Sequence, residues 1–286
     1  MDTAISLRNV VKRYDAFTLG ALNLDIPRGC ITGLVGENGA GKTTMLKGIL
    51  GLIHMDEGQI LLNGTPLDDL PGGWKNDVGV ILGDLDFAAA MNAQEIGLCL
   101  EHIYDRWQKR EYGKYLKQFK IDADKKIKDY SKGMKMKLNL AIALSHDAKL
   151  LIFDEATSGL DPVVRDEILD ILLEFIQDET HTVLISSHIT SDLEKISDYI
   201  AFLQEGKLKF FMNKDEMLCD YGVLRCSEKF LVKVPKKQIL SVRKGQFQCE
   251  VLVKGKDRLK ELEGEFAIDP TNIEEIILFL VKGEKP

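Results

Sequence analysis

The chain has 286 residues, of which 45% are hydrophobic and 29% charged, a composition typical of one large globular domain or two smaller ones. A formal net charge of −7 argues against a general nucleic-acid-binding protein, because such proteins usually carry a basic face. The N-terminus lacks the basic and apolar blocks of a signal peptide, and no apolar run approaches the roughly 18–20 residues that span a bilayer. Five scattered cysteines without a C-x-x-C pair are typical of reduced cytosolic thiols.

Two β-prone stretches, residues 5–11 and 19–26, come first and end at a turn at 27–29. They predict a small antiparallel layer beside a main sheet. Tyr14 follows the first stretch. The sequence leaves two roles open for Tyr14: an exposed ring that stacks on adenine, or a strand-end ring that packs on the core.

Residues 31–50 are the stretch around which the chain is organised. An apolar strand at 31–35 enters a glycine-rich turn, Gly36 to Thr43, which matches G-x-x-x-x-G-K-[ST] and leaves into a helix. Its glycines let several main-chain N–H groups approach a phosphate at the positive end of that helix. Lys42 adds a mobile charge for the β- and γ-phosphates, and the Thr43 hydroxyl can ligate Mg²⁺. The turn therefore predicts a site for nucleotide phosphates.

The region after the phosphate loop changes from strands to helices. Asn63-Gly64 between two apolar segments predicts a tight hairpin, and residues 78–82 predict a buried strand. Helical spacing at 88–104 and 106–119 predicts a helical insertion. Its aromatic residues either form a helical core or belong to a lobe that docks a partner. Ser131 is a good N-cap for the helix that covers the following residues.

Polar side chains follow two neighbouring strands in the second half of the chain. A short apolar strand at 149–153 ends in Asp154-Glu155, and charges there are costly unless they serve a metal or a reaction. The strand predicted at 182–186 is followed by His188. A histidine one strand along from an acidic pair is a catalytic candidate in a phosphate-loop protein.

Strand and helix alternate up to about residue 206, which predicts a doubly wound α/β sheet. Beyond that point the pattern becomes that of a small α+β appendage, residues 207–286. The appendage is predicted to contain strands at 230–234, 239–242 and 247–253 and helices at 257–262 and 273–281.

These motifs, in this order, resemble the ATP-binding subunit of a bacterial ABC transporter of the exporter-type group that handles peptides, drugs and antibiotics. The resemblance covers residues 5 to about 205. It implies a P-loop NTPase core at 1–206, mainly parallel sheet plus a small antiparallel β layer, with an inserted helical subdomain at about 84–145. Residues 207–286 would then form an accessory, regulatory or dimer-contact domain.

The resemblance assigns roles to individual residues. Lys42, Glu155 and His188 are implied to be catalytic, with Glu155 as general base or water-orienting group. Mg²⁺ is implied to bind Thr43 and Asp154. The residues implied to bind ATP are Tyr14, Gly36, Asn38, Gly39, Ala40, Gly41, Lys42, Thr43 and Thr44.

The signature segment departs from the usual Leu-Ser-Gly-Gly-Gln of the family. Lys132 replaces the first glycine and Met134 replaces the glutamine, whereas Ser131 and Gly133, expected to touch the partner subunit's ATP, are retained. This form resembles subunits paired with exporter-type permeases. Asp161 lies in the loop that crosses to the other subunit in this family.

A second departure lies after the strand at 78–82. The family usually has a glutamine there that bridges Mg²⁺ to the helical lobe, and this chain has Gly83-Asp84. Asp84 could serve the metal as a carboxylate instead of an amide.

The function implied by the resemblance is ATP hydrolysis that powers a membrane permease, as an exporter of peptides, drugs or lipids. The expected partners are permease subunits and a second ATP-binding subunit, without nucleic acid, at the cytoplasmic face of the membrane. Alternatives are a soluble ABC-type ATPase of translation or DNA repair and a non-hydrolysing regulatory subunit. The tail could regulate, stabilise a dimer or cap the sheet.

Overall fold

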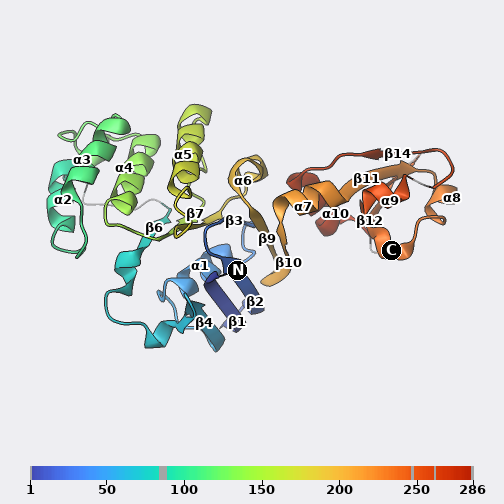
Figure 1. The fold of residues 1–286 in the computed structure, drawn as a ribbon, viewed down its shortest axis with the longest axis horizontal. Coiled ribbons are helices and arrows are strands. Elements are labelled where there is room, and N and C mark those ends of the chain that lie inside the picture. The colour runs from blue at the N-terminus through green and yellow to red at the C-terminus, as the bar shows by residue number, and fades with distance from the viewer. Residues whose placement is uncertain (1, 84–88, 246–247, 261, 285–286) are drawn as a thin grey trace.

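The computed structural model describes residues 2–83, 89–245, 248–260 and 262–284. Its described strands form three sheets, arranged along an elongated molecule (Figure 1). A helical subdomain lies at one end and the C-terminal sheet at the other, with the main sheet between them. This arrangement matches the predicted α/β fold with an inserted helical subdomain and a small C-terminal α+β appendage.

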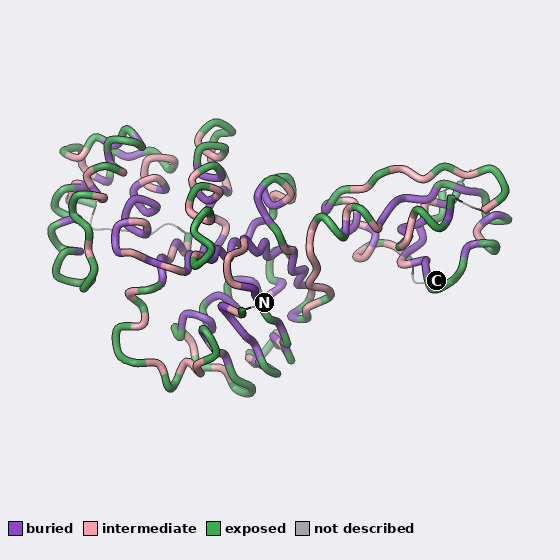
Figure 2. Tube along the Cα trace, in the orientation of Figure 1, coloured by how far each residue is buried: buried purple, intermediate pink, exposed green. Residues whose placement is uncertain are grey.

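The main sheet has the strand order β10-β9-β3-β8-β7-β6 within the described residues. Its inner pairs are parallel, and β10 runs antiparallel to β9 at one edge. All residues of β3, β7 and β8 are buried, which explains why they are continuous apolar runs rather than alternating ones. Figure 2 shows them as a buried band through the molecule. The strands are β3 (Ile31–Val35), β6 (Val78–Leu82), β7 (Leu150–Asp154), β8 (Thr182–Ser186), β9 (Tyr199–Gln204) and β10 (Lys207–Asn213).

The two faces of the main sheet are covered by different elements. The helix α1 (Lys42–Ile49) and an antiparallel sheet pack on one face. The helices α5 (Pro162–Phe175) and α6 (Thr190–Ile196) pack on the other face (Figure 1). Each of these helices follows a strand of the sheet directly, as an alternating strand–helix pattern requires.

The predicted antiparallel layer is present, in the order β2-β1-β4-β5. Asn63 and Gly64 join β4 to β5 with φ angles of 50° and 82°. Two consecutive positive φ angles are the mark of a type I′ hairpin turn, so the predicted hairpin is confirmed. The strands of this layer are β1 (Thr3–Tyr14), β2 (Phe17–Pro27), β4 (Glu57–Leu62) and β5 (Thr65–Pro66).

The helical subdomain contains α2 (Ala93–Leu100), α3 (Lys109–Gln118) and α4 (Lys132–Leu144). Both α2 and α3 are shorter than predicted, and α2 starts where Asn92 and Glu95 form a reciprocal capping box. The aromatic rings of this region pack on one another. Tyr104 stacks on the buried His146 with 4.1 Å between ring centroids, and Trp107 lies 5.0 Å from Tyr112. These rings form a core for the subdomain.

The C-terminal region holds a four-stranded sheet in the order β12-β13-β11-β14 within the described residues. The prediction of a strand at 230–234 is wrong, because the Ser227 hydroxyl accepts a hydrogen bond from Phe230 N and so starts a short helix. The sequence also missed α7, β11 and β14. The elements are α7 (Lys214–Asp220), β11 (Tyr221–Cys226), α8 (Glu228–Leu231), β12 (Ile239–Lys244), β13 (Cys249–Lys254), α9 (Lys256–Leu259), β14 (Phe266–Asp269) and α10 (Ile273–Lys282).

The C-terminal region packs on the core through α10 and α6. Ile273 N, at the start of α10, donates a hydrogen bond to Glu194 Oε2 on α6, at 3.1 Å. The strand β10 belongs to the main sheet, so that sheet extends past the predicted boundary at 206. The division of the chain into two domains stays a prediction, and the pairing of β10 favours a boundary after Asn213. No helix in the described ranges is long and apolar enough to cross a bilayer.

Gly206 joins the main sheet to the phosphate loop, and replacing it should destabilise the fold. Its N–H donates to Ala40 O, its φ is +73°, and an added Cβ would lie 2.0 Å from Thr18 O. Gly206→Ala should lower the free energy of unfolding by about 2–4 kcal/mol in urea titrations. Gly64→Ala is the matched control, because Gly64 has φ +82° but no atom within 4 Å of the added Cβ. Gly64→Ala should lower the free energy of unfolding by about 1 kcal/mol. Equal losses of stability in the two variants would show that the close approach to Thr18 has no energetic effect.

His146 should make stability depend on pH near neutrality. Its burial lowers the pKa of its imidazole, so the folded protein keeps it neutral where the unfolded chain already binds a proton. Stability should therefore fall as the pH drops below the unfolded pKa of about 6.5, by at most about 1.4 kcal/mol per pH unit. His146→Phe keeps a ring against Tyr104 and should show a smaller loss between pH 7.5 and 5.5. Identical pH profiles in urea titrations would refute the assignment.

Candidate functional site

The phosphate loop connects β3 to α1 at the carboxyl edge of the main sheet. Gly41 caps α1 with φ +105°, and an added Cβ there would lie 2.7 Å from Leu19 Cδ1. Gly39 has φ +83° and no atom within 4 Å of an added Cβ, so the tip of the loop is open. The other loop positions predicted to bind ATP lie on the same turn or on the first turn of α1, and their contact with ATP stays a prediction: Gly36, Asn38, Ala40, Lys42, Thr43 and Thr44.

Lys42 lies inside the loop with only 5% of its surface exposed. Its ammonium donates to Gly36 O at 2.7 Å and forms an ion pair with Glu155 Oε1 at 3.2 Å. A buried cation is costly unless it is paired and hydrogen-bonded, and these contacts satisfy both conditions. The sequence did not predict that Lys42 and Glu155 pair within one chain.

Asp154 is held between two hydroxyl groups at the end of β7. Thr43 Oγ1 donates to one carboxylate oxygen and Ser186 Oγ to the other, both at 2.6 Å. Asp154 and Ser186 are register partners on β7 and β8. Ser186 was missed by sequence reasoning; a hydroxyl at the end of the strand beside the acidic one was the available signal. A carboxylate beside a threonine hydroxyl is an all-oxygen donor set, which fits Mg²⁺.

Glu155 adopts a left-handed backbone conformation with φ +54°, uncommon for a residue other than glycine. Its N–H donates to both the carbonyl and the hydroxyl of Ser186, at 3.1 and 3.0 Å. One carboxylate oxygen faces Lys42 and the other contacts His188 Nδ1. Burial on its own raises the pKa of Glu155, but the bonds from His188 and Lys42 outweigh it and hold that pKa below its ordinary value. The carboxylate is therefore kept ionised.

Tyr14 lies at the end of β1, half exposed, on the hairpin that packs against the phosphate loop. Its register partner Phe17 would lie 2.9 Å from a Cβ added at Gly41. The ammonium of Lys12 lies 5.7 Å from the centre of the Tyr14 ring. The hairpin thus places an accessible aromatic ring near the loop, while stacking on adenine stays a prediction.

The signature residues lie apart from the phosphate loop. Ser131 caps α4 and accepts a hydrogen bond from Met134 N at 3.2 Å. Lys132 lines a cavity of about 180 Å³ together with Glu155. A Cβ on Gly133 would lie 3.2 Å from Val164 Cγ1, so the start of α4 packs on α5. Across the described ranges no hydrogen bond or ion pair joins residues 131–134 to the phosphate loop.

Asp161 lies on another element again. It caps α5 and accepts hydrogen bonds from Val163 N and Val164 N, both at 3.1 Å. Asp84 lies outside the described residues. The structure thus brings together the loop, Asp154, Glu155 and His188. The signature segment approaches this group only through Lys132, which shares a cavity with Glu155, and Asp161 lies on a different element.

Comparisons with known proteins agree with this geometry. Residues 19–158 match the family model described as "ABC transporter". The chain is 34% identical over 220 residues to the bacitracin transport ATP-binding protein BcrA of Enterococcus faecalis, covering 76% of this chain and 71% of that protein. It is 33% identical over 216 residues to the lantibiotic transport ATP-binding protein SrtF of Streptococcus pyogenes, covering 71% of this chain and 88% of that protein.

A solved structure of the ATP-binding subunit of an ABC transporter superposes with a TM-score of 0.67 at 26% identity. The superposition covers 75% of this chain and 91% of that one. Both the sequence and the fold comparisons therefore point to the same assignment as the phosphate loop and the acidic pair. The chain belongs to the ABC transporter family, among its ATP-binding proteins.

Proposed function

We propose that this chain binds Mg-ATP, hydrolyses it and uses the hydrolysis to power a membrane permease that exports peptides, drugs or lipids. The observation that carries the proposal is the convergence of Lys42, Asp154, Glu155 and His188 on one open loop. Phosphoryl transfer needs charge stabilisation and a positioned water, and these four side chains can supply both. Because its relatives are named as transport ATP-binding proteins, the alternatives of a soluble or a regulatory ATPase are disfavoured.

The phosphate loop would hold the β- and γ-phosphates through its main-chain amides and Lys42. Thr43 and Asp154 would hold Mg²⁺, which neutralises phosphate charge when bound. Ser186 fixes the orientation of Asp154 through its hydrogen bond. Its role is thus to position a ligand for the metal.

Glu155 would act as general base or orient the attacking water. Its carboxylate is ionised and contacts the Lys42 ammonium through one oxygen and the His188 ring through the other. A γ-phosphate would compete with Glu155 for Lys42, since both anions bind the same ammonium. That competition would free one carboxylate oxygen for water, while His188 retains the other.

A second copy of an ATP-binding subunit would complete the site. Ser131 and the N-terminal end of α4, supplied by the partner, would face the γ-phosphate across the open tip of the loop. ATP would then hold two subunits together, and hydrolysis would release them. The permease would anchor the pair to the cytoplasmic face of the membrane, and the helical subdomain would transmit the movement.

Replacing Glu155 by glutamine should slow ATP hydrolysis by about 100-fold or more and leave ATP binding largely intact. The amide keeps the shape of the side chain but cannot take up a proton. Phosphate release and calorimetric ATP binding measure the two effects. Glu216→Gln, on the exposed start of α7, is the matched control and should hydrolyse normally. Native turnover by Glu155→Gln would remove Glu155 as the base.

Mg-ATP should convert the Glu155→Gln variant from monomer to dimer in size-exclusion chromatography with light scattering. Bound, unhydrolysed ATP would keep the two subunits joined. Adding Ser131→Arg should abolish the dimer without abolishing ATP binding, because the bulky cation would obstruct the partner's site. A dimer that forms equally well without ATP, or that tolerates Ser131→Arg, would contradict the proposed arrangement.

A further inference from the structure

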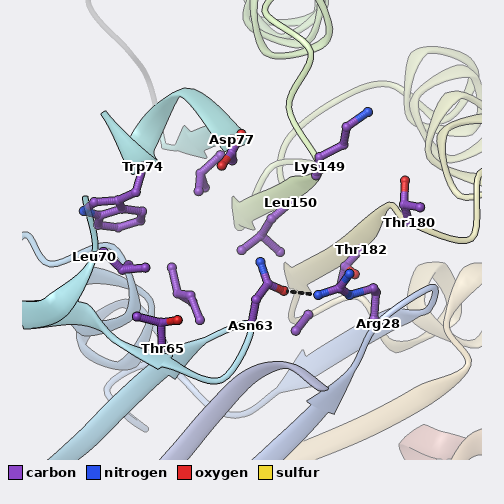
Figure 3. Close-up of a pocket in the computed structure, with 13 residues that line it drawn as sticks. Arg28, Asn63, Thr65, Leu70, Trp74, Asp77, Lys149, Leu150, Thr180 and Thr182 are labelled. Atoms are coloured by element: carbon purple, nitrogen blue, oxygen red, sulfur yellow. Dashed lines mark hydrogen bonds between the residues drawn. The ribbon is translucent and has the colours of Figure 1, made fainter. Parts of the chain in front are cut away.

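A cavity of about 530 Å³ lies at the amino ends of two strands of the main sheet, whereas the phosphate loop lies at the carboxyl ends. Figure 3 shows the residues that line it. It is lined by Leu150 and Thr182, the first residues of β7 and β8. Asp154 lies at the other end of β7, four residue steps or about 13 Å away along the strand. The cavity is therefore separate from the proposed nucleotide site.

One side of the cavity is apolar. Leu62 and Leu150 contribute buried side chains, while Leu70 and Trp74 are half-buried. Figure 3 shows the Trp74 indole and Leu70 on the side away from Arg28. Trp74 belongs to a short 3₁₀ helix, η2 (Trp74–Asp77). A flat apolar group would find an aromatic ring and aliphatic side chains here.

The other side of the cavity carries a cation, the guanidinium group of Arg28. Arg28 donates a hydrogen bond to Asn63 Oδ1 at 2.7 Å, and no carboxylate in the described part of the chain pairs with it. Guanidinium groups have five N–H donors, so most of those on Arg28 remain available. Asp77, the carboxylate in the lining, is already paired with Arg106. The charges that line the cavity thus favour the binding of an anion.

We propose that this cavity binds a small amphipathic anion, with a carboxylate, sulfonate or phosphate head on Arg28 and a flat apolar body against Trp74. Arginine matches such heads with paired hydrogen bonds, and the buried hydroxyl of Thr182 lies in the same lining. The volume falls within the range of about 300–1,000 Å³ that small-molecule sites occupy.

Binding at this cavity would reach the helical subdomain through η2. Asn76 Nδ2 donates to Asp105 Oδ2 at 3.0 Å, and Asn76 O accepts a hydrogen bond from Arg106 at 3.0 Å. The ring of His146 also contacts Asn76 O, at 3.1 Å. The segment that lines the cavity is therefore in direct contact with the helical subdomain. The anion would act as a regulator of that contact.

The test uses the aromatic sulfonate 1-anilinonaphthalene-8-sulfonate as the probe, with the full chain. Its fluorescence should rise with saturable, one-site binding that ATP does not displace. Arg28→Gln should weaken the affinity by about tenfold or more. Thr65→Trp, which fills the cavity and leaves Arg28 unchanged, should also weaken the affinity for the probe. This second variant keeps the test decisive if Arg28→Gln fails to fold. Arg258→Gln, an exposed arginine on α9, should bind as the wild type does.

The proposal is overturned if the probe binds without saturation or at several equal sites. It is also overturned if ATP displaces the probe, or if folded Arg28→Gln and Thr65→Trp both keep wild-type affinity. Thermal melting establishes that each variant is folded. The outcome is independent of ATP hydrolysis, because neither substitution lies at the phosphate loop.

Discussion

The ion pair between Lys42 and Glu155 joins the two strand ends on which the candidate site depends. Lys42 begins α1 after β3, and Glu155 follows β7, two strands away in the same sheet. Burying a cation in the loop is favourable only with a matched anion and hydrogen-bond acceptors. The ammonium that pairs with Glu155 is also the one that a phosphate would use.

The parallel sheet explains why the polar residues meet. The carboxyl ends of β3, β7 and β8 lie at one edge, where ligands bind in open α/β sheets. The register of β7 and β8 places Asp154 opposite Ser186. The Ser186 hydroxyl can therefore donate a hydrogen bond that orients the Asp154 carboxylate. The turn at Gly206 fixes the loop from the other side through Ala40.

Local signals in the sequence were sufficient for much of the fold. The glycine pattern at 36–43, the apolar runs of β7 and β8 and the Asn63-Gly64 turn each depend on nearby residues, and the structure has all of them. Phe230 was misassigned because its apolar neighbours resemble a strand, while the cap on Ser227 decides for a helix. In each case the deciding interaction lies within a few residues.

Contacts between residues far apart in the chain could not be predicted from the sequence. Lys42 and Glu155 are 113 positions apart, and nothing in either segment specifies that their side chains meet. The cavity beside Arg28 joins residues from β4, η2, β7 and β8, so it exists only after the layers pack. The positive φ of Glu155 likewise follows from its two bonds to Ser186 on a neighbouring strand.

The proposed function depends above all on the binding of ATP phosphates by the amides of the phosphate loop. Hydrogen–deuterium exchange with and without Mg-ATP measures this most directly, peptide by peptide. We expect slower exchange in the peptide that spans residues 36–43 when Mg-ATP is bound. Unchanged exchange in that peptide, with protection appearing elsewhere in the chain, would contradict the proposed site.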